Sequence, residues 1–399
     1  MRIAFVTTEY MTEEEFDGGL SNYLNRTVQA LKSRGHYIEV FTLSNNEQEI
    51  SYQGVLVHQV KNQSFFFEFL NQLTRYRFKR TLRFLSLSYC LLRRVIKRSR
   101  IQNFDIIQAS SCFACGLFLS VFQRIPIAVR VSSFEPLFRQ YYRRPLSLDQ
   151  HLCEFLESLT LRLSRSVYAP SRFLADILKK QKKIKAQVIR PPFFLNTSPW
   201  DESVYEKCLS GKKYFLFFGA IGYLKGGKIL AQSLAEVLPK YPELYFAFAG
   251  KVLEGPNGLN MLEYIYKKAG KNKDRILYLG VLNHSQLYPV IKHSFSVVLP
   301  SLVDNFPNTM LEAMALEKVV IGTRGTSFEE LIRPRLSGIL IEPGNVKSLS
   351  DAIDKVWNMN EEDIKTMGQK AKNCISYLSP QITCLKLEQY FANIIKKGK

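Results

Sequence analysis

Two acidic residues, Asp304 and Glu312, flank the start of an expected helix and are separated by seven residues. An apolar run ends at Pro300, and a polar turn then leads into apolar residues at helical spacing. The free amides and the positive end of such a helix suit a phosphate group. Carboxylates, in contrast, accept hydrogen bonds from hydroxyl groups. Acids beside phosphate-binding amides therefore indicate a site for a nucleotide sugar.

The elements around the two acids predict one half of a nucleotide-binding fold. An expected strand near Phe295 precedes the turn, and a second strand at residues 318–322 follows the helix. Pro307 falls at an early helix position, with Asn308 and Thr309 beside the free amides. Because ligands of such folds bind at the carboxyl end of a strand, the helix start is the expected binding point.

A second loop, within residues 217–228, carries a cation that suits a diphosphate. The pattern predicts a strand, a loop and a helix that begins at Gly226 and Gly227, with Lys225 at the end of the loop. A lysine at that place offers a compact positive charge to phosphate. The alternative is a helix-initial lysine in solvent. The segment contains neither the GxGxxG dinucleotide fingerprint nor a P-loop.

A glycine pair, Gly18 and Gly19, follows Asp17 and the first expected strand. Glycines before a helix let a ligand approach the backbone closely, although many loops carry two glycines without binding anything. The five histidines show no metal-ligand spacing and no hydrolase motif. We expect all five to be structural or surface residues, with the role of His151 left open. No metal and no cofactor is expected, the nucleotide sugar being a substrate.

Alternating strand and helix patterns predict an α/β protein with two doubly wound, Rossmann-like domains that face a central cleft. Residues 1–195 form the expected first domain, which would bind the molecule that accepts the sugar. Residues 214–378 form the expected second domain. The polar segment 196–213 lacks strong periodicity and is predicted to be a linker. The C-terminal helix, residues 379–399, is expected to pack back on the first domain.

The positive charge of the chain is concentrated in one segment. The 55 basic and 35 acidic residues give a formal net charge of +20. No acid occurs between Glu68 and Asp105, and apolar residues from Phe78 to Ile96 step by four and three, as in an amphipathic helix. Phenylalanines cluster just before, within residues 65–69. The ten bases of the segment are Arg75, Arg77, Lys79, Arg80, Arg83, Arg93, Arg94, Lys97, Arg98 and Arg100.

Three uses of residues 65–100 stay open. The segment could be an ordinary domain helix with a solvated basic face, or a cationic, aromatic surface that docks on anionic lipid headgroups. The same side chains could also line a cleft that binds the acceptor of the sugar. Nucleic acid is not expected as a partner because no nucleic-acid-binding motif accompanies the charge.

The pattern of cysteines and the lack of long apolar segments indicate the cellular compartment of the protein. The seven cysteines have no framework spacing, and Cys112 and Cys115 lie in apolar surroundings, so we expect buried thiols in a reducing environment. Residues 1–10 resemble a first strand more than a signal peptide. The longest apolar stretch, residues 112–122, is shorter than the roughly 20 residues of a spanning helix. We expect a cytoplasmic protein, and peripheral contact with the inner face of a membrane is one of the open uses of residues 65–100.

Taken together, these residues resemble the retaining nucleotide-sugar glycosyltransferases of the GT-B fold, family 4. The resemblance covers nearly the whole chain and is strongest at residues 300–330, good at residues 217–227 and moderate at residues 17–35. Members carry an acid, seven residues and a Glu, usually with Glu first, where this chain has Asp304 and Glu312. The resemblance implies transfer of a sugar from a nucleotide diphosphate to a hydroxyl group of a glycan, glycolipid or polysaccharide precursor.

The resemblance also implies roles for individual residues. Glu312 would bind the ribose hydroxyls, Asp304 the donor sugar near its 3-hydroxyl, and Lys225 the diphosphate. No dedicated nucleophile is evident, so the leaving phosphate would help to deprotonate the acceptor in a front-face substitution. The other donor-binding residues would be Gly18, Gly19, Gly219, Asn305, Phe306, Pro307, Asn308, Thr309 and Leu311.

Two positions depart from the family pattern. Ala220 stands where members often have an Arg five residues before the phosphate-binding Lys, and Ser132 lies where they often have a His. Arg130, Arg139 or Lys228 could supply the missing contacts. A non-catalytic partner subunit of the same fold is therefore an alternative, as is a sugar-nucleotide epimerase, for which the supply of histidines is poor.

Overall fold

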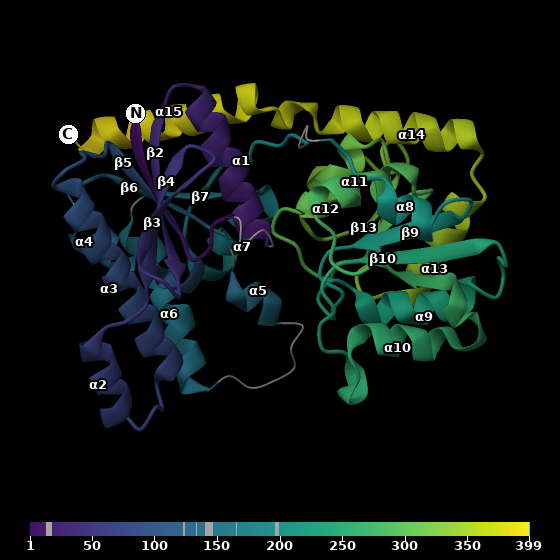
Figure 1. Ribbon diagram of the computed structural model, residues 1–399, viewed down its shortest axis with the longest axis horizontal. Helices are drawn as coiled ribbons and strands as arrows, with labels where there is room; N and C mark the ends of the chain where they lie inside the picture. The colour runs from purple at the N-terminus through teal and green to yellow at the C-terminus, as the bar shows by residue number, and fades with distance from the viewer. Residues whose placement is uncertain are drawn as a thin grey trace. The chain divides into compact units, whose positions relative to one another are not determined.

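A computed structural model places the chain in two compact units (Figure 1). Unit 1 comprises Met1–Pro192 together with Leu378–Lys399, and unit 2 comprises Phe193–Tyr377. Asp17 of the expected glycine loop, Ser133 and residues 196–198 of the expected linker lie outside the described residues. The structure describes residues 1–12, 18–122, 124–132, 134–139, 147–164, 166–195 and 199–398.

Unit 1 is built on an eight-stranded sheet in the order β3-β4-β2-β1-β5-β6-β7-β8. All neighbours pair in parallel except β3 and β4. The central strands are nearly continuous apolar runs because both faces of a parallel sheet are covered. The strands are β1 (Arg2–Val6), β2 (Tyr37–Ser44), β3 (Gln48–Tyr52), β4 (Val55–Lys61), β5 (Ile106–Ser110), β6 (Ile127–Arg130), β7 (Val167–Ala169) and β8 (Gln187–Val188).

The antiparallel edge strand β3 is an element that the sequence patterns did not indicate. It forms a hairpin with β4 through Gln53 and Gly54, whose φ angles are 49° and 69°. Two-residue hairpin turns of this kind favour positive φ at both positions, which glycine adopts without strain. The sequence signal that could have indicated this hairpin is Gly54, which follows the alternating polar and apolar side chains of residues 49–52.

The helices of unit 1 form two groups. Helices α3, α4 and α6 pack on one another, whereas α1 packs on α15 (Figure 1). The helices are α1 (Gly19–Ser33), α2 (Phe65–Leu73), α3 (Lys79–Ser99), η1 (Cys112–Ala114), α4 (Leu117–Phe122), α5 (Glu135–Arg139), α6 (Leu148–Leu163), α7 (Arg172–Lys182) and α15 (Pro380–Gly398).

Helix α15 belongs to unit 1 although all of unit 2 precedes it in the chain. Leu387 and Phe391 are buried in the same core as the strands of unit 1. Glu388 accepts hydrogen bonds from the Arg34 guanidinium, with Nη2 at 2.8 Å, and lies 2.8 Å from His36 Nε2. Apolar burial and an ion pair therefore hold the C-terminal helix against α1.

Helix α3 lies in the basic segment, and its buried face agrees only in part with the expected apolar stripe. Leu82 and Leu92 of that stripe are buried, whereas Tyr89 is exposed and Leu85 is only partly buried. Leu87, Leu91 and Val95 face the core instead. Both stripes have helical spacing, so the period predicted the helix without deciding which stripe packs.

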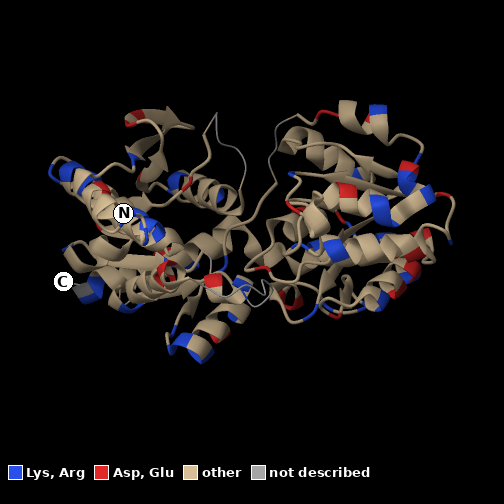
Figure 2. Cartoon of the chain, turned by 90° about the horizontal axis from the view of Figure 1, so that it is seen from below, with Lys and Arg blue, Asp and Glu red and all other residues tan. Residues whose placement is uncertain are grey.

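Part of the basic charge of α3 is compensated within unit 1. Glu39 on β2 is fully buried and accepts hydrogen bonds from Arg98 and from Tyr37, and His58 Nε2 lies 2.7 Å from its carboxylate. Arg94 pairs with Glu49 at 2.6 Å. Lys and Arg also occur on many other helices, as Figure 2 shows.

Unit 2 contains a six-stranded sheet in the order β11-β10-β9-β12-β13-β14, and every neighbouring pair is parallel. Its core is rich in aromatic rings, among them Phe215, Phe246 and Trp357. The strands are β9 (Lys213–Phe218), β10 (Leu244–Ala249), β11 (Ile276–Tyr278), β12 (Ser296–Leu299), β13 (Val320–Thr323) and β14 (Ile339–Ile341).

The helices of unit 2 follow its strands in the manner of a doubly wound fold. For example, α9 and α13 pack on each other, and α10 packs on α9. The helices are α8 (Ser203–Cys208), α9 (Gly227–Val237), η2 (Pro256–Gly258), α10 (Met261–Ala269), η3 (Gly270–Arg275), α11 (His284–His293), α12 (Asn308–Ala315), η4 (Ser327–Glu330), α13 (Val346–Trp357), α14 (Glu361–Cys374) and η5 (Ser376–Leu378).

The described part of the expected linker, residues 199–213, packs within unit 2. It contains α8, which packs on α11, and Leu209 is fully buried. The Trp200 ring lies 5.9 Å from that of Tyr288, and Asp201 N–H donates to the carbonyl of Ser285 at 3.0 Å. The segment lacked periodicity because its single helix is short, and a few large side chains anchor it instead.

Candidate functional site

The sheet of unit 2 changes direction between β9 and β12. The chain proceeds outward from β9 through β10 to β11, then returns to β12 and proceeds the other way through β13 to β14. Ligands of such sheets bind beyond the carboxyl ends of the strands at this switch point. The loops after β9 and β12 therefore define the candidate site, and Leu302 N–H ties them together by donating to the carbonyl of Leu224 at 2.8 Å.

Lys225 and Asp304, which the sequence assigned to phosphate and sugar, form an ion pair across these loops. The Lys225 Nζ donates to Asp304 Oδ2 at 2.5 Å. The lysine side chain is 38% exposed, whereas the aspartate side chain is 10% exposed. Each charge neutralises the other, and the backbone carbonyl of Asp304 accepts a further hydrogen bond from Ser327 Oγ at 2.9 Å.

Gly226 places Lys225 by allowing its loop to lie directly against the end of β12. Its φ angle is 81°, and a Cβ at this position would lie 2.1 Å from the carbonyl oxygen of Pro300. Only glycine permits so close a backbone approach. Gly219, at the end of β9, has a φ angle of 112° and faces Thr309 on the adjacent helix.

Helix α12 supplies the expected amides. The helix begins at Asn308, and its N-cap Pro307 makes no side-chain capping hydrogen bond. Pro307 thus lies one residue before the early helix position that was expected. Because the first N–H groups of a helix lack intrahelical acceptors, the amides of Asn308 and Thr309 are oriented to bind an anion.

Glu312 lies about one turn inside α12 and is 4% exposed. The Nε2 atom of His284 is 3.4 Å from Glu312 Oε1. His284 is the first residue of α11, which begins after the capping residue Asn283. Sequence reasoning treated this histidine as structural or surface. The capping Asn283 places it at a helix start, but no spacing in the sequence connects His284 with Glu312.

The remaining residues expected at the donor site differ in accessibility. Asn305 and Phe306 are partly buried in the loop before α12, and Lys228 is exposed on α9. Leu311 is fully buried in the core, so its side chain is not available to a ligand and only its backbone could contribute. The structure thus brings Lys225, Asp304 and the start of α12 together at the switch point.

The glycine loop of unit 1 already carries an acid. Gly18 is the N-cap of α1, has a φ angle of 125°, and is followed by Gly19 as the first helical residue. Glu9 Oε1 accepts a hydrogen bond from Ser21 N–H at 3.2 Å, and a Cβ on Gly18 would lie 3.0 Å from it. A phosphate approaching this helix start would therefore meet a carboxylate.

Arg130 and Arg139, considered as replacement cations, both have partners within unit 1. The Arg130 guanidinium lies 3.6 Å from the centroid of the Tyr23 ring and donates to Ser132 Oγ at 2.9 Å. Arg139 donates to Glu154 Oε1 at 2.6 Å. Ser132, where family members often have a histidine, thus anchors Arg130.

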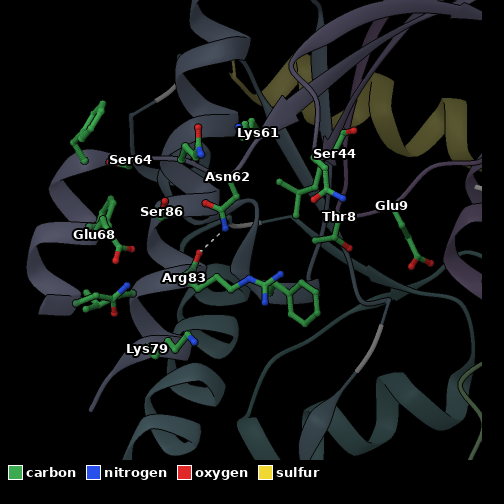
Figure 3. Close-up of a pocket in the computed structure, with 18 of the residues that line it drawn as sticks. Thr8, Glu9, Ser44, Lys61, Asn62, Ser64, Glu68, Lys79, Arg83 and Ser86 are labelled. Carbon is green, nitrogen blue, oxygen red and sulfur yellow. Dashed lines mark hydrogen bonds between the residues drawn. The ribbon is translucent and has the colours of Figure 1, made fainter. Parts of the chain in front are cut away.

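A large pocket of about 1100 Å³ lies at the carboxyl ends of β1, β2 and β4 in unit 1 (Figure 3). Its walls come from the loops after these strands, from α2 and α3, and from Phe113 after β5. Lys61, Lys79 and Arg83 contribute positive charge, and Thr8 and Glu9 lie on the opposite side. We call this cavity the unit 1 pocket.

A smaller cavity of about 290 Å³, also within unit 1, contains several acids. Burial raises the pKa of Glu157 there to about 8, and the neighbouring carboxylates of Glu135 and Glu154 act in the same direction. The N–H of Phe113 donates to Glu157 Oε1 at 3.0 Å and partly opposes this rise of the pKa. Glu157 is thus largely protonated at neutral pH.

Among the described residues, no cluster of three His, Cys, Asp or Glu side chains has the arrangement of a metal site. None of the helices within that part of the chain has the length and apolarity needed to cross a bilayer. None of the seven cysteines forms a disulfide, and all seven lie among the described residues. Cys115 is fully buried, whereas Cys112 is only partly buried, so of this pair the expected burial holds for Cys115 alone.

Known structures share this fold. The chain matches sucrose-phosphate synthase from Thermosynechococcus elongatus with a TM-score of 0.79 at 16% identity, covering 99% of both chains. It matches Anabaena HepE in complex with UDP-glucose with a TM-score of 0.73 at 17% identity, covering 98% of this chain and 100% of that one. The protein therefore has the GT-B fold, with one Rossmann-like sheet in each unit.

Sequence comparison identifies the family within this fold. Residues 17–193 match the model of glycosyltransferase family 4, and residues 205–374 match that of the glycosyl transferases group 1. An uncharacterized glycosyltransferase of Methanocaldococcus jannaschii is 24% identical over 90% of this chain and 91% of its own length. O-antigen chain mannosyltransferase C of Escherichia coli is 25% identical over 93% and 92%, respectively. Both units thus match glycosyltransferase family models, and the chain is a glycosyltransferase of the GT-B fold.

Proposed function

We propose that the protein transfers a hexosyl unit from a nucleotide diphosphate sugar to an acceptor hydroxyl with retention of anomeric configuration. The observation that carries the proposal is the convergence of Lys225, Asp304 and the start of α12 at the switch point of unit 2. The cation and the helix amides suit the diphosphate, and the acids suit hydroxyl groups. A structural neighbour in complex with UDP-glucose supports this class of donor.

The ion pair between Lys225 and Asp304 has a direct consequence for donor binding. A diphosphate at the α12 amides would draw the Lys225 ammonium toward itself, because it carries more negative charge than one carboxylate. Asp304 would then accept hydrogen bonds from the sugar in place of the ammonium. During transfer, negative charge grows on the leaving diphosphate, and Lys225 with the amides stabilises it.

Glu312 would hold the ribose hydroxyls, and His284 would position its carboxylate. The contact of 3.4 Å restricts the orientation of a side chain that is otherwise enclosed. In the proposed front-face reaction, the bond between the anomeric carbon and the leaving phosphate oxygen breaks as the acceptor oxygen bonds to the same carbon. The acceptor proton passes to the leaving phosphate, so no protein nucleophile is required.

The acceptor is proposed to be a glycan, a glycolipid or a polysaccharide precursor of the cell envelope. The E. coli relative named as an O-antigen chain mannosyltransferase supports this class. The proposed reaction needs no metal, since Lys225 and the α12 amides supply the positive electrostatic potential. Transfer should therefore persist in EDTA, whereas its complete loss on chelation, with recovery on adding a divalent cation, would contradict this part.

The proposed function is tested by incubating the protein with a panel of nucleotide diphosphate sugars and a membrane glycan extract. We expect release of the nucleoside diphosphate with one donor and a product whose anomeric configuration, measured by NMR coupling constants, matches that donor. A product of inverted configuration would contradict retention. Binding of a donor without turnover would favour the non-catalytic partner subunit that Ala220 suggests.

We also propose that the protein acts in the cytoplasm, at the inner face of a membrane, through residues 65–100. The rings of Phe65, Phe66 and Phe69 on α2 are 98%, 64% and 61% exposed, and Leu73 is 69% exposed. Several exposed arginines and lysines follow within the next turn and at the start of α3. Apolar rings beside basic side chains are the combination that binds anionic lipid surfaces.

Vesicle sedimentation tests this contact. The protein should pellet with vesicles of phosphatidylcholine and phosphatidylglycerol but much less with phosphatidylcholine alone. Phe66→Ser with Phe69→Ser should lose most of the binding, whereas Leu148→Ser, which removes an equally exposed side chain from α6, should retain it. Equal sedimentation of all three proteins would contradict the assignment of the surface to α2.

A further inference from the structure

The unit 1 pocket contains three cations that form no ion pair with the described residues. Lys61 is the last residue of β4, and Lys79 and Arg83 lie one turn apart on α3. Figure 3 shows Lys79 and Arg83 extending into the pocket from the same helix. Within the part of the chain that the structure describes, the side chains of all three form no ion pair.

The two acids of the pocket are engaged elsewhere. Glu9 accepts from the Ser21 amide at the start of α1, on the side of the pocket away from α3. Glu68 accepts a hydrogen bond from Tyr76 Oη at 3.4 Å. The pocket therefore has a net positive charge on its α3 side, and this charge would attract an anion.

Two amide side chains in the pocket offer unused hydrogen-bonding capacity. Asn62 Oδ1 and Asn71 Oδ1 are buried and have no hydrogen-bond partner among the described residues. Asn71 is only 8% exposed, and Asn62 uses its amide nitrogen to donate to the carbonyl of Arg83 at 3.4 Å (Figure 3). Buried acceptors without partners are costly, and a ligand hydroxyl would satisfy them.

The same pocket has an apolar wall that continues onto the surface of α2. Phe65 and Phe67 line it from α2, and Phe113 lines it from the loop after β5. Phe66 and Phe69 lie on the same helix and are exposed. An apolar chain attached to a bound headgroup would therefore find aromatic side chains leading out of the pocket.

We propose that the unit 1 pocket binds the phosphorylated headgroup of the glycosyl acceptor: a phosphate ester beside free hydroxyl groups. Lys61, Lys79 and Arg83 hold the phosphate, and Asn62 and Asn71 accept from the hydroxyls. The term acceptor rests on the proposed function, but the binding itself does not. A neutral glycan would leave three cations uncompensated, so the phosphate distinguishes this acceptor from an unmodified sugar chain.

The test measures binding of dioctanoylphosphatidylglycerol to the full chain by calorimetry, below the micelle concentration and without donor. This probe has a phosphate ester, two hydroxyls and short apolar chains. Glycerol 1-phosphate carries the same headgroup without chains, and dioctanoylphosphatidylcholine carries neither hydroxyls nor net charge. We expect the first probe to bind, dioctanoylphosphatidylcholine to fail, and Lys79→Ala with Arg83→Ala to weaken binding at least tenfold.

Matched variants separate this site from the others. Lys97→Ala removes an exposed cation from α3 outside the pocket and should leave the affinity unchanged. Phe66→Ser with Phe69→Ser should weaken binding of vesicles and of the lipid probe but should leave the affinity for glycerol 1-phosphate unchanged. Glu312→Gln should abolish donor use without changing this affinity, so a failure of the donor site and a failure of this pocket are distinguishable.

Each outcome decides the proposal. If glycerol 1-phosphate binds as tightly as the lipid, the phosphate and hydroxyls suffice, and the acceptor source is a soluble sugar phosphate. Tighter binding of the lipid indicates a lipid-linked acceptor. If neither phosphate probe binds to the wild-type protein, or if Lys79→Ala with Arg83→Ala binds as well as the wild-type protein while its melting temperature is unchanged, the pocket is not a phosphate site.

Discussion

The two candidate sites handle charge in opposite ways. In unit 2, Lys225 and Asp304 neutralise each other before any ligand is present, and Glu312 is enclosed beside His284. In the unit 1 pocket, three cations have no ion-pair partner among the described residues, and two buried amide oxygens lack a hydrogen bond.

The difference indicates what a ligand must do at each site. A donor in unit 2 must replace an existing ion pair, so its binding energy depends on rearranging Lys225. A ligand in the unit 1 pocket instead supplies a charge that the protein lacks. We therefore expect the first site to discriminate strongly among donors and the second to accept any headgroup with phosphate and hydroxyls.

The largest effect is expected for Glu312→Gln, which removes the carboxylate assigned to the ribose. Transfer should fall by about 10³-fold in kcat/KM, corresponding to about 4 kcal/mol of transition-state stabilisation. Steady-state release of the nucleoside diphosphate measures this. Glu362→Gln, an exposed change on α14, is the control. Activity within threefold of the wild-type protein would remove Glu312 from the donor site.

The buried charge of Glu39 in unit 1 contrasts with the unit 1 pocket, because neighbouring side chains compensate this charge fully. Burial raises the pKa of Glu39, but hydrogen bonds from His58, Arg98 and Tyr37 outweigh it and lower the pKa to about 2. Glu39→Gln should lower the free energy of unfolding by about 3 kcal/mol, since it leaves buried donors without their charged partner. Glu47→Gln, at an exposed position, should have little effect.

The same cluster predicts a dependence on acid. Because the pKa of Glu39 is lower in the folded state than the ordinary value of 4.5, its contribution to stability is complete above that value. The contribution is lost as the pH falls toward about 2. Denaturant unfolding of the wild-type protein should weaken over this range, and Glu39→Gln should weaken less. Parallel curves for both proteins would contradict the pKa shift.

Lys225→Ala tests whether the ion pair or the cation itself serves the donor site. The variant leaves Asp304 unpaired near the diphosphate, so both lost attraction and new repulsion should act. We expect a loss of about 10²-fold in kcat/KM, with partial retention in Lys225→Arg. Lys370→Ala on α14 controls for general charge effects. A fully active Lys225→Ala would show that the amides of α12 alone hold the phosphate.

The smallest effect is expected at Glu157 in the acidic cavity of unit 1. Its pKa of about 8 is above the ordinary value of 4.5, so the folded state binds a proton more tightly than the unfolded state. Stability should therefore decrease as the pH rises, by about 2 kcal/mol between about pH 6 and pH 8. Glu157→Gln should remove this slope in denaturant unfolding, whereas Asp176→Asn, an exposed change on α7, should retain it.

Much of the fold and part of the candidate donor site could be predicted from local patterns. Alternating strands and helices indicated two doubly wound domains. The turn before α12 carried Asp304, and the helix itself carried Glu312 with seven residues between them. Short-range signals of this kind need no tertiary information, because a strand, a turn and a helix start place their side chains locally.

What the sequence could not predict depends on contacts between distant segments. The pairing of Lys225 with Asp304 joins loops 79 residues apart, and His284 meets Glu312 from another helix. The buried face of α3 was predicted only in part, because apolar residues form two stripes of helical period and packing on the neighbouring elements selects between them. From the sequence, Lys79 and Arg83 were assigned only to the surface of one helix, and Lys61 was not connected with them. The unit 1 pocket brings the three together because it also combines the ends of three strands.

The central claim is that the switch point of unit 2 binds a nucleotide diphosphate sugar. Calorimetric titration of a panel of such donors into the wild-type protein, Glu312→Gln and Lys225→Ala tests it most directly. We predict that one donor binds the wild-type protein and that each variant weakens it at least tenfold without lowering the melting temperature. Binding of that donor with the same affinity by all three proteins, or binding of no donor to the wild-type protein, would contradict the account.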